Sequence, residues 1–400
     1  YPHPLHPHIL KRDASTVMST GDGNTEGEDH GSVDVPDGAI LTSLPVQGNT
    51  SIAAFWTASP NNASAEQAFV MIHGKLRDGN DYWTTMNDVL QSAVSANYPG
   101  ASNNSIVTAP EFYSTILNSG QYDDNELAWP DTNAWQAGDP ANHPSSTNQT
   151  SFDALDAFVA EFSDQSKYPS MKNLTFVGHG GGGQLIARYA MVARDAPCNL
   201  HVRYISGDPS SNAYFTPDRP VNSSDSSAVQ DCPLYNTWRY GYDNFTGTLE
   251  GLFTAQEYFT RYTRRDFVSI VGLQDTDYDG DQYCMASVQG GTARRDRNLC
   301  WWQYLNALAG TDEVLTDFPC QFDNLPDWSN ITNGVMGPRL SVVADADHSA
   351  EEVYESDEGR SALFSSGDIL VGWRPEGWQA ATGTFTPGIV ACAAPASSTS

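Results

Sequence analysis

One stretch near the middle of the chain, residues 173–186, places the strongest limit on what the sequence can fold into. It begins with the apolar run Leu174–Val177, continues through Gly178, His179 and four consecutive glycines, and then carries apolar residues at helical spacing. Glycines are needed where a chain reverses within a few residues and where a helix passes close to a strand. The stretch therefore predicts a short buried strand, a sharp turn and a helix.

Other glycine-rich turns fit this stretch less well. A phosphate-binding loop requires Gly-Lys followed by Ser or Thr, and no such triplet follows Gly183. A dinucleotide-binding turn lies early in a chain and is followed by an acidic residue about 20 residues later, and neither condition fits well. A loose loop is the remaining alternative.

The charge of the chain argues against several classes of partner. Its 400 residues carry a formal net charge of −29, with 20 Lys and Arg residues. Binding of nucleic acid or of a phosphorylated substrate needs many basic side chains, so neither is expected. No apolar run of about 20 residues is present, so no membrane span is expected. The length is enough for one large α/β domain with insertions, or for two domains.

Several features are typical of a secreted glycoprotein. The chain opens at Tyr1 as a processed chain would. Lys11-Arg12 is either a dibasic processing site that releases a chain starting at Asp13, or two stray basic residues in a flexible terminus. Acceptor triplets for N-glycans, Asn-x-Ser/Thr, lie at Asn49, Asn62, Asn103, Asn148, Asn173, Asn222, Asn244 and Asn330. We therefore expect an extracellular protein that carries N-glycans.

The six cysteines point to the same compartment. An even number of cysteines without a Cys-x-x-Cys motif is typical of three disulfides in an oxidising environment. Fifteen pairings of six cysteines are possible. Of these we expect Cys198–Cys232, Cys284–Cys300 and Cys320–Cys392.

Short apolar segments alternate with helical patterns along most of the chain. Residues 1–35 are polar and without periodicity, which predicts a disordered arm or prosegment, although His3, His6 and His8 could bind a metal. Strands are expected at 39–41, 51–56, 68–72, 105–109, 202–206, 267–272 and 339–343, and helices at 81–96, 151–163 and 301–308. Thr150 and Asp153 resemble a capping box at the start of the second helix. This alternation predicts a largely parallel sheet with an antiparallel opening hairpin.

Three candidate catalytic positions follow strands of this sheet in chain order. Gly180 lies in the glycine turn, Asp275 follows the strand at 267–272, and His348 follows the strand at 339–343. Ligands of open α/β sheets bind beyond the carboxyl ends of the strands, so these positions can converge. Nucleophile, acid and histidine occur in this order in one class of hydrolase.

The sequence resembles the α/β-hydrolase superfamily, in a secreted, microbial branch of fungal type. Gly178 and Gly182 match the outer glycines of the G-x-S-x-G motif, and Arg188-Tyr189-Ala190 follows at the matching distance. The resemblance implies an eight-stranded, mostly parallel sheet with flanking helices, built from 36–207 and 263–400. It also implies a lid at 208–262, and an oxyanion hole formed by the backbone N–H groups of Gly181 and Lys75.

The sequence departs from this family at the position that matters most for chemistry. Gly180 stands where the motif has its nucleophilic serine, and glycine has no hydroxyl that a histidine could deprotonate. Ordinary serine hydrolysis is therefore not expected. Either a serine hydrolase has been inactivated by a Ser→Gly change, or Asp275 and His348 act as a dyad that moves protons or activates water.

Other residues are predicted to bind the substrate. His73, Gly74 and His179 flank the turns of the site, and Trp129, Trp135, Trp238 and Tyr240 either line an apolar pocket or form core. Asp275, Asp277 and Asp279 copy the start of a calcium loop, but the twelfth position of that loop is Ala286 and not Glu. We therefore predict no metal and no cofactor.

Two hypotheses for function follow. The first is an enzyme of esterase- or lactonase-like lineage that acts on a neutral hydrophobic or aromatic small molecule by isomerisation, elimination, condensation or hydrolysis with water. The second is a catalytically dead protein that uses the hydrolase scaffold to bind a ligand.

Overall fold

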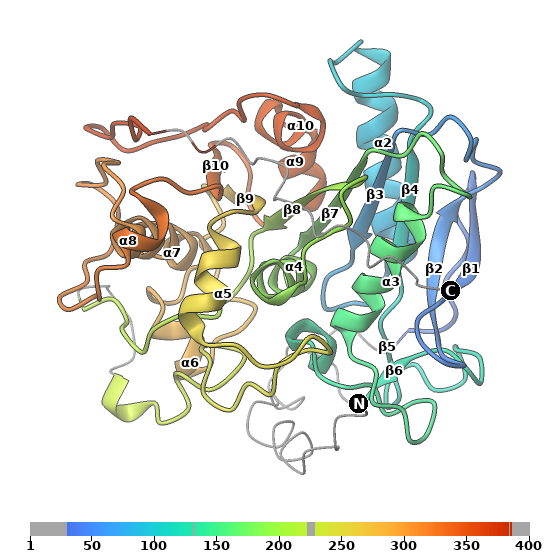
Figure 1. Cartoon of the computed structure of the whole chain (residues 1–400), viewed down its shortest axis with the longest axis horizontal. Helices are drawn as coiled ribbons and strands as arrows, with labels where there is room; N and C mark the ends of the chain where they lie inside the picture. The colour runs from blue at the N-terminus through green and yellow to red at the C-terminus, as the bar shows by residue number, and fades with distance from the viewer. Residues whose placement is uncertain (1–29, 131–132, 222–228, 384, 386–400) are drawn as a thin grey trace, which may run out of the picture.

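The computed structural model of the chain describes residues 30–130, 133–221, 229–383 and 385. An eight-stranded sheet runs through the middle of the molecule in the order β1-β2-β4-β3-β7-β8-β9-β10 (Figure 1). Its strands are β1 (Ala39–Pro45), β2 (Ser51–Thr57), β3 (Gln67–Ile72), β4 (Ile106–Pro110), β7 (Asn173–His179), β8 (His201–Gly207), β9 (Asp266–Gly272) and β10 (Arg339–Val343). The β1–β2 and β2–β4 pairs are antiparallel and the other pairs of this sheet are parallel, so the predicted, mostly parallel sheet with an opening hairpin is confirmed.

Strand β3 shows why the sheet needs a helix layer on each face. Its residues Ala68–Ile72 are almost fully buried, as expected of a continuous apolar run in a parallel sheet. Successive side chains of a strand point to opposite faces. Accordingly, Val70 and Ile72 belong to one hydrophobic core, whereas Phe69 and Met71 belong to the other.

Helices cover both faces of the sheet (Figure 1). One core is closed by α2 (Gly79–Ser95), α9 (Ala350–Glu355) and α10 (Asp357–Phe364). The other is closed by α3 (Ser151–Ser163), α4 (Gly181–Val192), α5 (Ala255–Tyr262) and α7 (Arg294–Ala309). The shorter helices are α6 (Cys284–Ser287), α8 (Ser329–Thr332), η1 (Ala134–Ala137) and η2 (Val229–Asp231). Within the described residues, no helix combines the length and apolarity that crossing a bilayer requires.

The start of α3 confirms a local prediction. The Thr150 side chain accepts a hydrogen bond from the Asp153 N–H, and the Asp153 carboxylate accepts one from the Thr150 N–H. This reciprocal pair satisfies two backbone donors that the first turn of a helix leaves without partners. Asp therefore serves in the place that Glu usually takes.

The predicted disulfide pairing is wrong. The structure joins Cys232 to Cys284 and Cys300 to Cys320, and Cys198 is also disulfide-bonded. The pairing was predicted from order along the chain alone. The fold instead brings together cysteines of separate segments. Cys232 lies between β8 and β9 whereas Cys284 follows β9, so their disulfide joins the segments on either side of that strand.

The loops also differ in part from the prediction. Residues 1–29, with His3, His6 and His8, lie outside the described residues, but His30 already hydrogen-bonds the carbonyl oxygen of Arg77. The polar and aromatic loop after β4 contains a small parallel pair, β5 (Tyr113–Ser114) and β6 (Ala128–Trp129). The segment 208–262 lies between β8 and β9 and contains α5, and its role as a lid stays a prediction.

A buried ion network at the start of β9 is expected to make stability depend on acid. Asp266 accepts hydrogen bonds from His201 and Arg203 and pairs with Arg339. Burial alone would raise the pKa of Asp266, but these partners outweigh it and lower that pKa to about 2. A carboxylate with a lowered pKa stabilises the fold above its ordinary pKa, and this contribution is lost as the pH falls from about 4 to about 2. We expect Asp266→Asn to cost about 2 kcal/mol of unfolding free energy at pH 7, measured by urea unfolding. The exposed Asp345→Asn should leave it near the parent value, and equal losses in both variants would contradict the assignment.

Candidate active site

The turn between β7 and α4 is as tight as its glycines predict. Gly180 has φ 55° and ψ −112°, a conformation that side-chain-bearing residues rarely adopt. Two residues later, a Cβ on Gly182 would collide with the carbonyl oxygen of Ile72 at the end of β3. The turn therefore holds position 180 in a strained conformation above the sheet, next to the β3 end.

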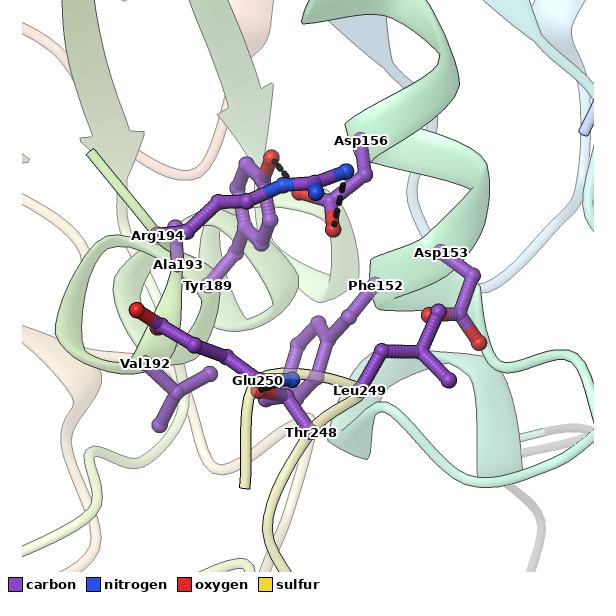
Figure 2. A pocket seen from close by; sticks show the side chains of 10 residues that line it. All are labelled: Phe152, Asp153, Asp156, Tyr189, Val192, Ala193, Arg194, Thr248, Leu249 and Glu250. Atoms are coloured by element: carbon purple, nitrogen blue, oxygen red, sulfur yellow. Dashed lines mark hydrogen bonds and ion pairs between the residues drawn. The ribbon is translucent and has the colours of Figure 1, made fainter. Parts of the chain in front are cut away.

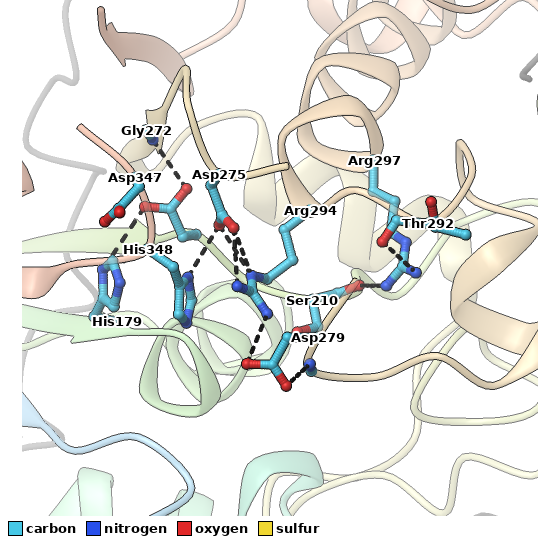
Figure 3. A network of polar contacts seen from close by, with 12 residues as sticks. His179, Ser210, Gly272, Asp275, Asp279, Thr292, Arg294, Arg297, Asp347 and His348 are labelled. Atoms are coloured by element: carbon cyan, nitrogen blue, oxygen red, sulfur yellow. Dashed lines mark hydrogen bonds and ion pairs between the residues drawn. The ribbon is translucent and has the colours of Figure 1, made fainter. Parts of the chain in front are cut away.

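Asp275 and His348 lie side by side at the carboxyl ends of β9 and β10. The Nδ1 atom of His348 is 3.0 Å from the Oδ2 atom of Asp275, and Arg294 donates from Nε to the same carboxylate at 2.9 Å (Figure 3). Burial opposes ionisation of Asp275, but the hydrogen bonds from His348 and Arg294 outweigh it and lower its pKa to about 2. The ionised carboxylate accepts the Nδ1 proton of His348, which leaves Nε2 as the free, basic nitrogen.

The free nitrogen of His348 faces the glycine turn. A Cβ built on Gly180 would lie 3.1 Å from Nε2 of His348 and 3.4 Å from its Cε1 atom. Apart from Gly180 and its chain neighbours, no other heavy atom of the described residues is within 4 Å of that position. The space that a side chain at position 180 would fill is therefore open and lies within hydrogen-bond reach of a base.

A cavity of about 190 Å³ opens beside this position. It is lined by Gly74, Lys75, Leu76, Asp78, Tyr82, Asn133, Gln136, Gly180, Gly181, Gln184, Ser210, Asp279, Gly280, Asp281, Arg294 and His348. Most of these side chains are polar or charged. The wall therefore offers a ligand hydrogen-bonding and charged groups together with apolar surface, because most of its exposed area comes from apolar atoms.

Backbone N–H groups meet at one side of the cavity. The N–H of Gly181 is the first of helix α4, so no carbonyl within that helix can accept its hydrogen bond. The amide nitrogen of Lys75 lies 3.4 Å from the position that a Cβ would take on Gly181. Two main-chain donors and the positive end of a helix dipole thus lie beside Gly180, where they could bind an oxyanion.

A second pair of titratable groups is packed against the dyad. The ring of His179 lies 4.6 Å from the ring of His348, centre to centre, and its Nδ1 atom is 3.8 Å from the Asp208 carboxylate. Burial lowers the pKa of His179 well below its usual value. Burial, and then the charge on Asp275, raise the pKa of Asp208. The pKa of Asp208 is thus raised whereas that of Asp275 is lowered, although the two carboxyl groups lie near the same pair of histidines.

His73 has a structural environment. The Phe112 N–H donates to Nε2 of His73 at 3.0 Å, and Nδ1 lies 2.7 Å from the carbonyl oxygen of Gly74. Because Nε2 accepts, Nδ1 must carry the proton and donate to Gly74. His73 therefore shapes the turn that presents Gly74 and Lys75 to the cavity, but its own ring does not line that cavity.

The four predicted aromatic residues form core. Trp129, Trp135, Trp238 and Tyr240 are fully buried, and none of them is part of the described cavity wall. The indole N–H groups of Trp129 and Trp238 donate to backbone carbonyls, and the Tyr240 hydroxyl donates to Asp281 at 2.6 Å. Of the two interpretations given above for these residues, the structure places them in the core.

Arg294 pairs with the aspartates of the acidic loop after β9. Its guanidinium contacts both oxygens of Asp275 and lies 4.0 Å from Asp279. The guanidinium of Arg294 supplies at Asp275 the positive charge that a calcium ion would bring, so the carboxylate of Asp275 is already paired by a side chain of the protein.

A smaller hollow of about 110 Å³ lies away from the dyad, between α3, the end of α4 and the loop at 248–250 (Figure 2). Asp156 accepts a hydrogen bond from Tyr189 at 2.7 Å and pairs with Arg194 at 3.5 Å. No histidine or cysteine is among the described residues that line this hollow. It therefore offers carboxylates but no imidazole or thiol to match the cavity beside Gly180.

Sequence reasoning missed several residues in and around the cavity. Asp208 directly follows β8, so the same rule that selected Asp275 and His348 at strand ends would have selected it. Gln184 was visible next to the glycine run. Asn133, Gln136 and Arg294 come from a loop, a short helix and a helix start that carry no sequence signal of their own.

Comparison with known proteins supports the architecture. No family model and no curated protein matches the sequence. The structure is similar to poly(aspartic acid) hydrolase-1 from Sphingomonas sp. KT-1, with a TM-score of 0.53 at 16% identity, covering 79% of this chain and 95% of that one. It is also similar to LpqC, a poly(3-hydroxybutyrate) depolymerase from Bordetella parapertussis, with a TM-score of 0.53 at 16% identity, covering 82% and 90%. At this level of identity the likeness concerns architecture, and on that ground the chain has the α/β-hydrolase fold.

Proposed function

We propose that the protein hydrolyses a small polar ester or lactone with a water molecule in place of the serine nucleophile. The observation that carries the proposal is the open position at Gly180, which lies 3.1 Å from Nε2 of His348. A water oxygen cannot take the Cβ position itself, which is one covalent bond from Cα, but in the open space just beyond it, where a serine hydroxyl would reach, it would be in hydrogen-bond contact with the base. A histidine oriented by a carboxylate is the group that most often removes a proton from such a water.

The proposed reaction has two proton transfers. Nε2 of His348 takes a proton from the water as its oxygen attacks the carbonyl carbon, and the negative charge moves to the carbonyl oxygen. The N–H groups of Lys75 and Gly181 stabilise that oxyanion. The bond to the leaving oxygen then breaks, and His348 returns the proton to it. Asp275 stays ionised throughout and orients the ring.

The substrate class follows from the cavity wall. The sequence predicts a hydrophobic or aromatic substrate and leaves open whether the tryptophans line the pocket or form core; in the structure they are core. The wall instead presents Lys75, Asp279 and Asn133, so we propose a substrate with several hydrogen-bonding groups. The similar solved structures are named as a poly(aspartic acid) hydrolase and a poly(3-hydroxybutyrate) depolymerase, so hydrolysis is the activity that their names share.

We also propose that the protein works outside the cell and carries N-glycans. The disulfides Cys232–Cys284 and Cys300–Cys320 support an oxidising compartment. Mass analysis before and after enzymatic deglycosylation of the protein from its native secretion tests the glycans.

The test of the proposed activity compares the parent with His348→Gln on a panel of small esters and lactones. We expect the variant to lose about 10²- to 10⁴-fold in turnover, because general base catalysis contributes about that much. The matched control is His201→Gln, which removes another histidine paired with an aspartate, 2.8 Å from Asp266 and outside the cavity. The control should keep the parent rate.

Two results would contradict the proposal. One is turnover by His348→Gln equal to that of the parent. The other is binding of substrate analogues in the cavity without turnover of any ester or lactone by the parent, which would instead support a protein that only binds its ligand.

A further inference from the structure

Beneath His348 lies a cluster of polar atoms that have no hydrogen-bond partners. His179 is 2% exposed and Asp208 is fully buried. Among the described residues, neither ring nitrogen of His179 nor the Oδ2 atom of Asp208 has a hydrogen-bond partner. Buried polar side-chain atoms are nearly always bonded, so three unpartnered atoms in one place need an explanation.

The cluster has the composition of a metal site. One ligand atom each from His179, Asp208 and His348 lies within 4.8 Å of the others, and Nδ1 of His179 is 3.8 Å from Oδ2 of Asp208. Zinc binds imidazole nitrogen at about 2.0–2.1 Å and carboxylate oxygen at about 2.0–2.2 Å, so in a tetrahedral site its ligand atoms lie about 3.4 Å apart. Rotations of the three side chains that together shorten the longest of these separations by at most about 1.4 Å would close the cluster around a tetrahedral ion.

The surroundings fit this use of the cluster. A histidine that binds a metal usually donates its other ring N–H to a carboxylate, and His348 already pairs with Asp275 through Nδ1 at 3.0 Å. Figure 3 shows His179, His348 and Asp275 next to one another at the strand ends. The His348 side chain is 31% exposed and lines the cavity, so an ion has a route from solvent.

We propose that His179, Asp208 and His348 bind one divalent transition-metal ion of the zinc class. Two imidazoles and one carboxylate are donors that zinc and cobalt(II) prefer, whereas magnesium and calcium prefer oxygen donors alone. Three protein ligands leave a fourth coordination position open, as in sites that exchange their metal or bind water.

Metal binding would take His348 out of the proposed reaction. A neutral imidazole has one nitrogen with a lone pair and one with a proton. Once the lone pair is on the metal, the other nitrogen carries the proton and no base remains, whichever nitrogen binds. The ion would therefore inhibit turnover by His348. This consequence rests on the proposed function, but the binding itself does not.

The test is a titration of the chelator-treated whole protein with Co²⁺ alone, followed by visible absorption and by equilibrium dialysis. We expect one equivalent with the intense spectrum of a tetrahedral site. His179→Phe keeps a ring beside His348 without a ligand atom, and Asp208→Asn keeps the shape of the carboxylate. Each variant should lose that equivalent, with affinity lowered about 100-fold or more, since even indirect neighbours of a metal contribute 10–100-fold.

The control separates this site from others in the chain. His3, His6 and His8 could hold a second ion, and His201 forms a histidine–aspartate pair elsewhere. His201→Gln should therefore retain the tetrahedral spectrum, and ions held by the N-terminal histidines should persist in every variant. Circular dichroism checks that each variant is folded.

Two outcomes would overturn the proposal: a parent without a tetrahedral Co²⁺ spectrum, or folded variants that bind the same equivalent with unchanged affinity. Either result would mean that His179 and Asp208 bind no metal ion and are buried in their uncharged forms. Zn²⁺ inhibition of ester turnover is measured separately. If the metal binds without inhibition, the metal site stands and the role of His348 in the reaction fails.

Discussion

Replacing Gly180 with serine is expected to raise ester hydrolysis by at least about 10³-fold. The new Cβ would lie 3.1 Å from Nε2 of His348, and the hydroxyl, one bond further out, can rotate into hydrogen-bond contact with that nitrogen. Nucleophile, base and orienting acid would then all be in place beside two oxyanion donors. Loss of a nucleophilic serine from an intact triad costs about 10⁶-fold, so even an imperfect serine should produce a large gain.

The measurement is the hydrolysis of chromogenic short-chain esters, with Gly180→Ala as the matched control. Both variants add a Cβ at φ 55°, and this should cost each about 1–3 kcal/mol of unfolding free energy. Only the serine variant should gain activity, and it should be inactivated by a phosphonate ester that reacts with an activated serine. An equal rate in both variants would contradict the geometry assigned to His348.

The outcome also bears on the history of the chain. A gain of several orders of magnitude would mean that the oxyanion donors and His348 have kept the geometry that a serine nucleophile requires. A folded but inactive serine variant would mean that the site has been adapted to another task, such as the activation of water or the binding of an ion.

The parts of this fold that could be predicted are those with a local signal. Residues 173–186 predict their strand, turn and helix, because Gly182 passes so close to Ile72 that no side chain fits there. The sequence must therefore carry glycine at this point. The capping box at Thr150 and the apolar run of β3 are equally local. The carboxyl ends of parallel strands lie at one edge of a sheet, and this rule predicts the meeting of Asp275 and His348 there.

The parts that could not be predicted depend on contacts between distant segments. Arg294 reaches Asp275 from a helix start that has no pattern of its own, and the cysteine pairing depends on how the segment after β8 folds over the helices. Tryptophans gave a misleading signal, because a buried indole such as that of Trp238 satisfies its N–H on a backbone carbonyl and then behaves as core.

Replacing Asp275 with asparagine is expected to lower turnover by about 10⁴-fold, both in the parent and in the Gly180→Ser variant. The carboxylate accepts the Nδ1 proton of His348 at 3.0 Å, whereas an asparagine NH₂ group in that place donates to Nδ1 and moves the ring proton to Nε2. A histidine with the wrong tautomer cannot take a proton from water or serine, even though its position is unchanged. The rates are measured on the same chromogenic esters. Nitrogen-15 NMR of the His348 ring gives the tautomer directly, which a merely structural role of Asp275 would not change.

Stability must be separated from this effect, because Asp275 also neutralises Arg294. Its removal leaves a guanidinium with 2% exposure without its main partner, which should cost about 3 kcal/mol of unfolding free energy. The matched control is Asp279→Asn, which removes a carboxylate 4.0 Å from Arg294 without a hydrogen bond to His348. We expect the control to keep the Nδ1–H tautomer and turnover within about tenfold of the parent, since only a cavity-wall contact is lost. If both variants are folded and lose turnover equally, the negative charge near Arg294 controls the rate. The orientation of His348 by Asp275 would then not be its cause.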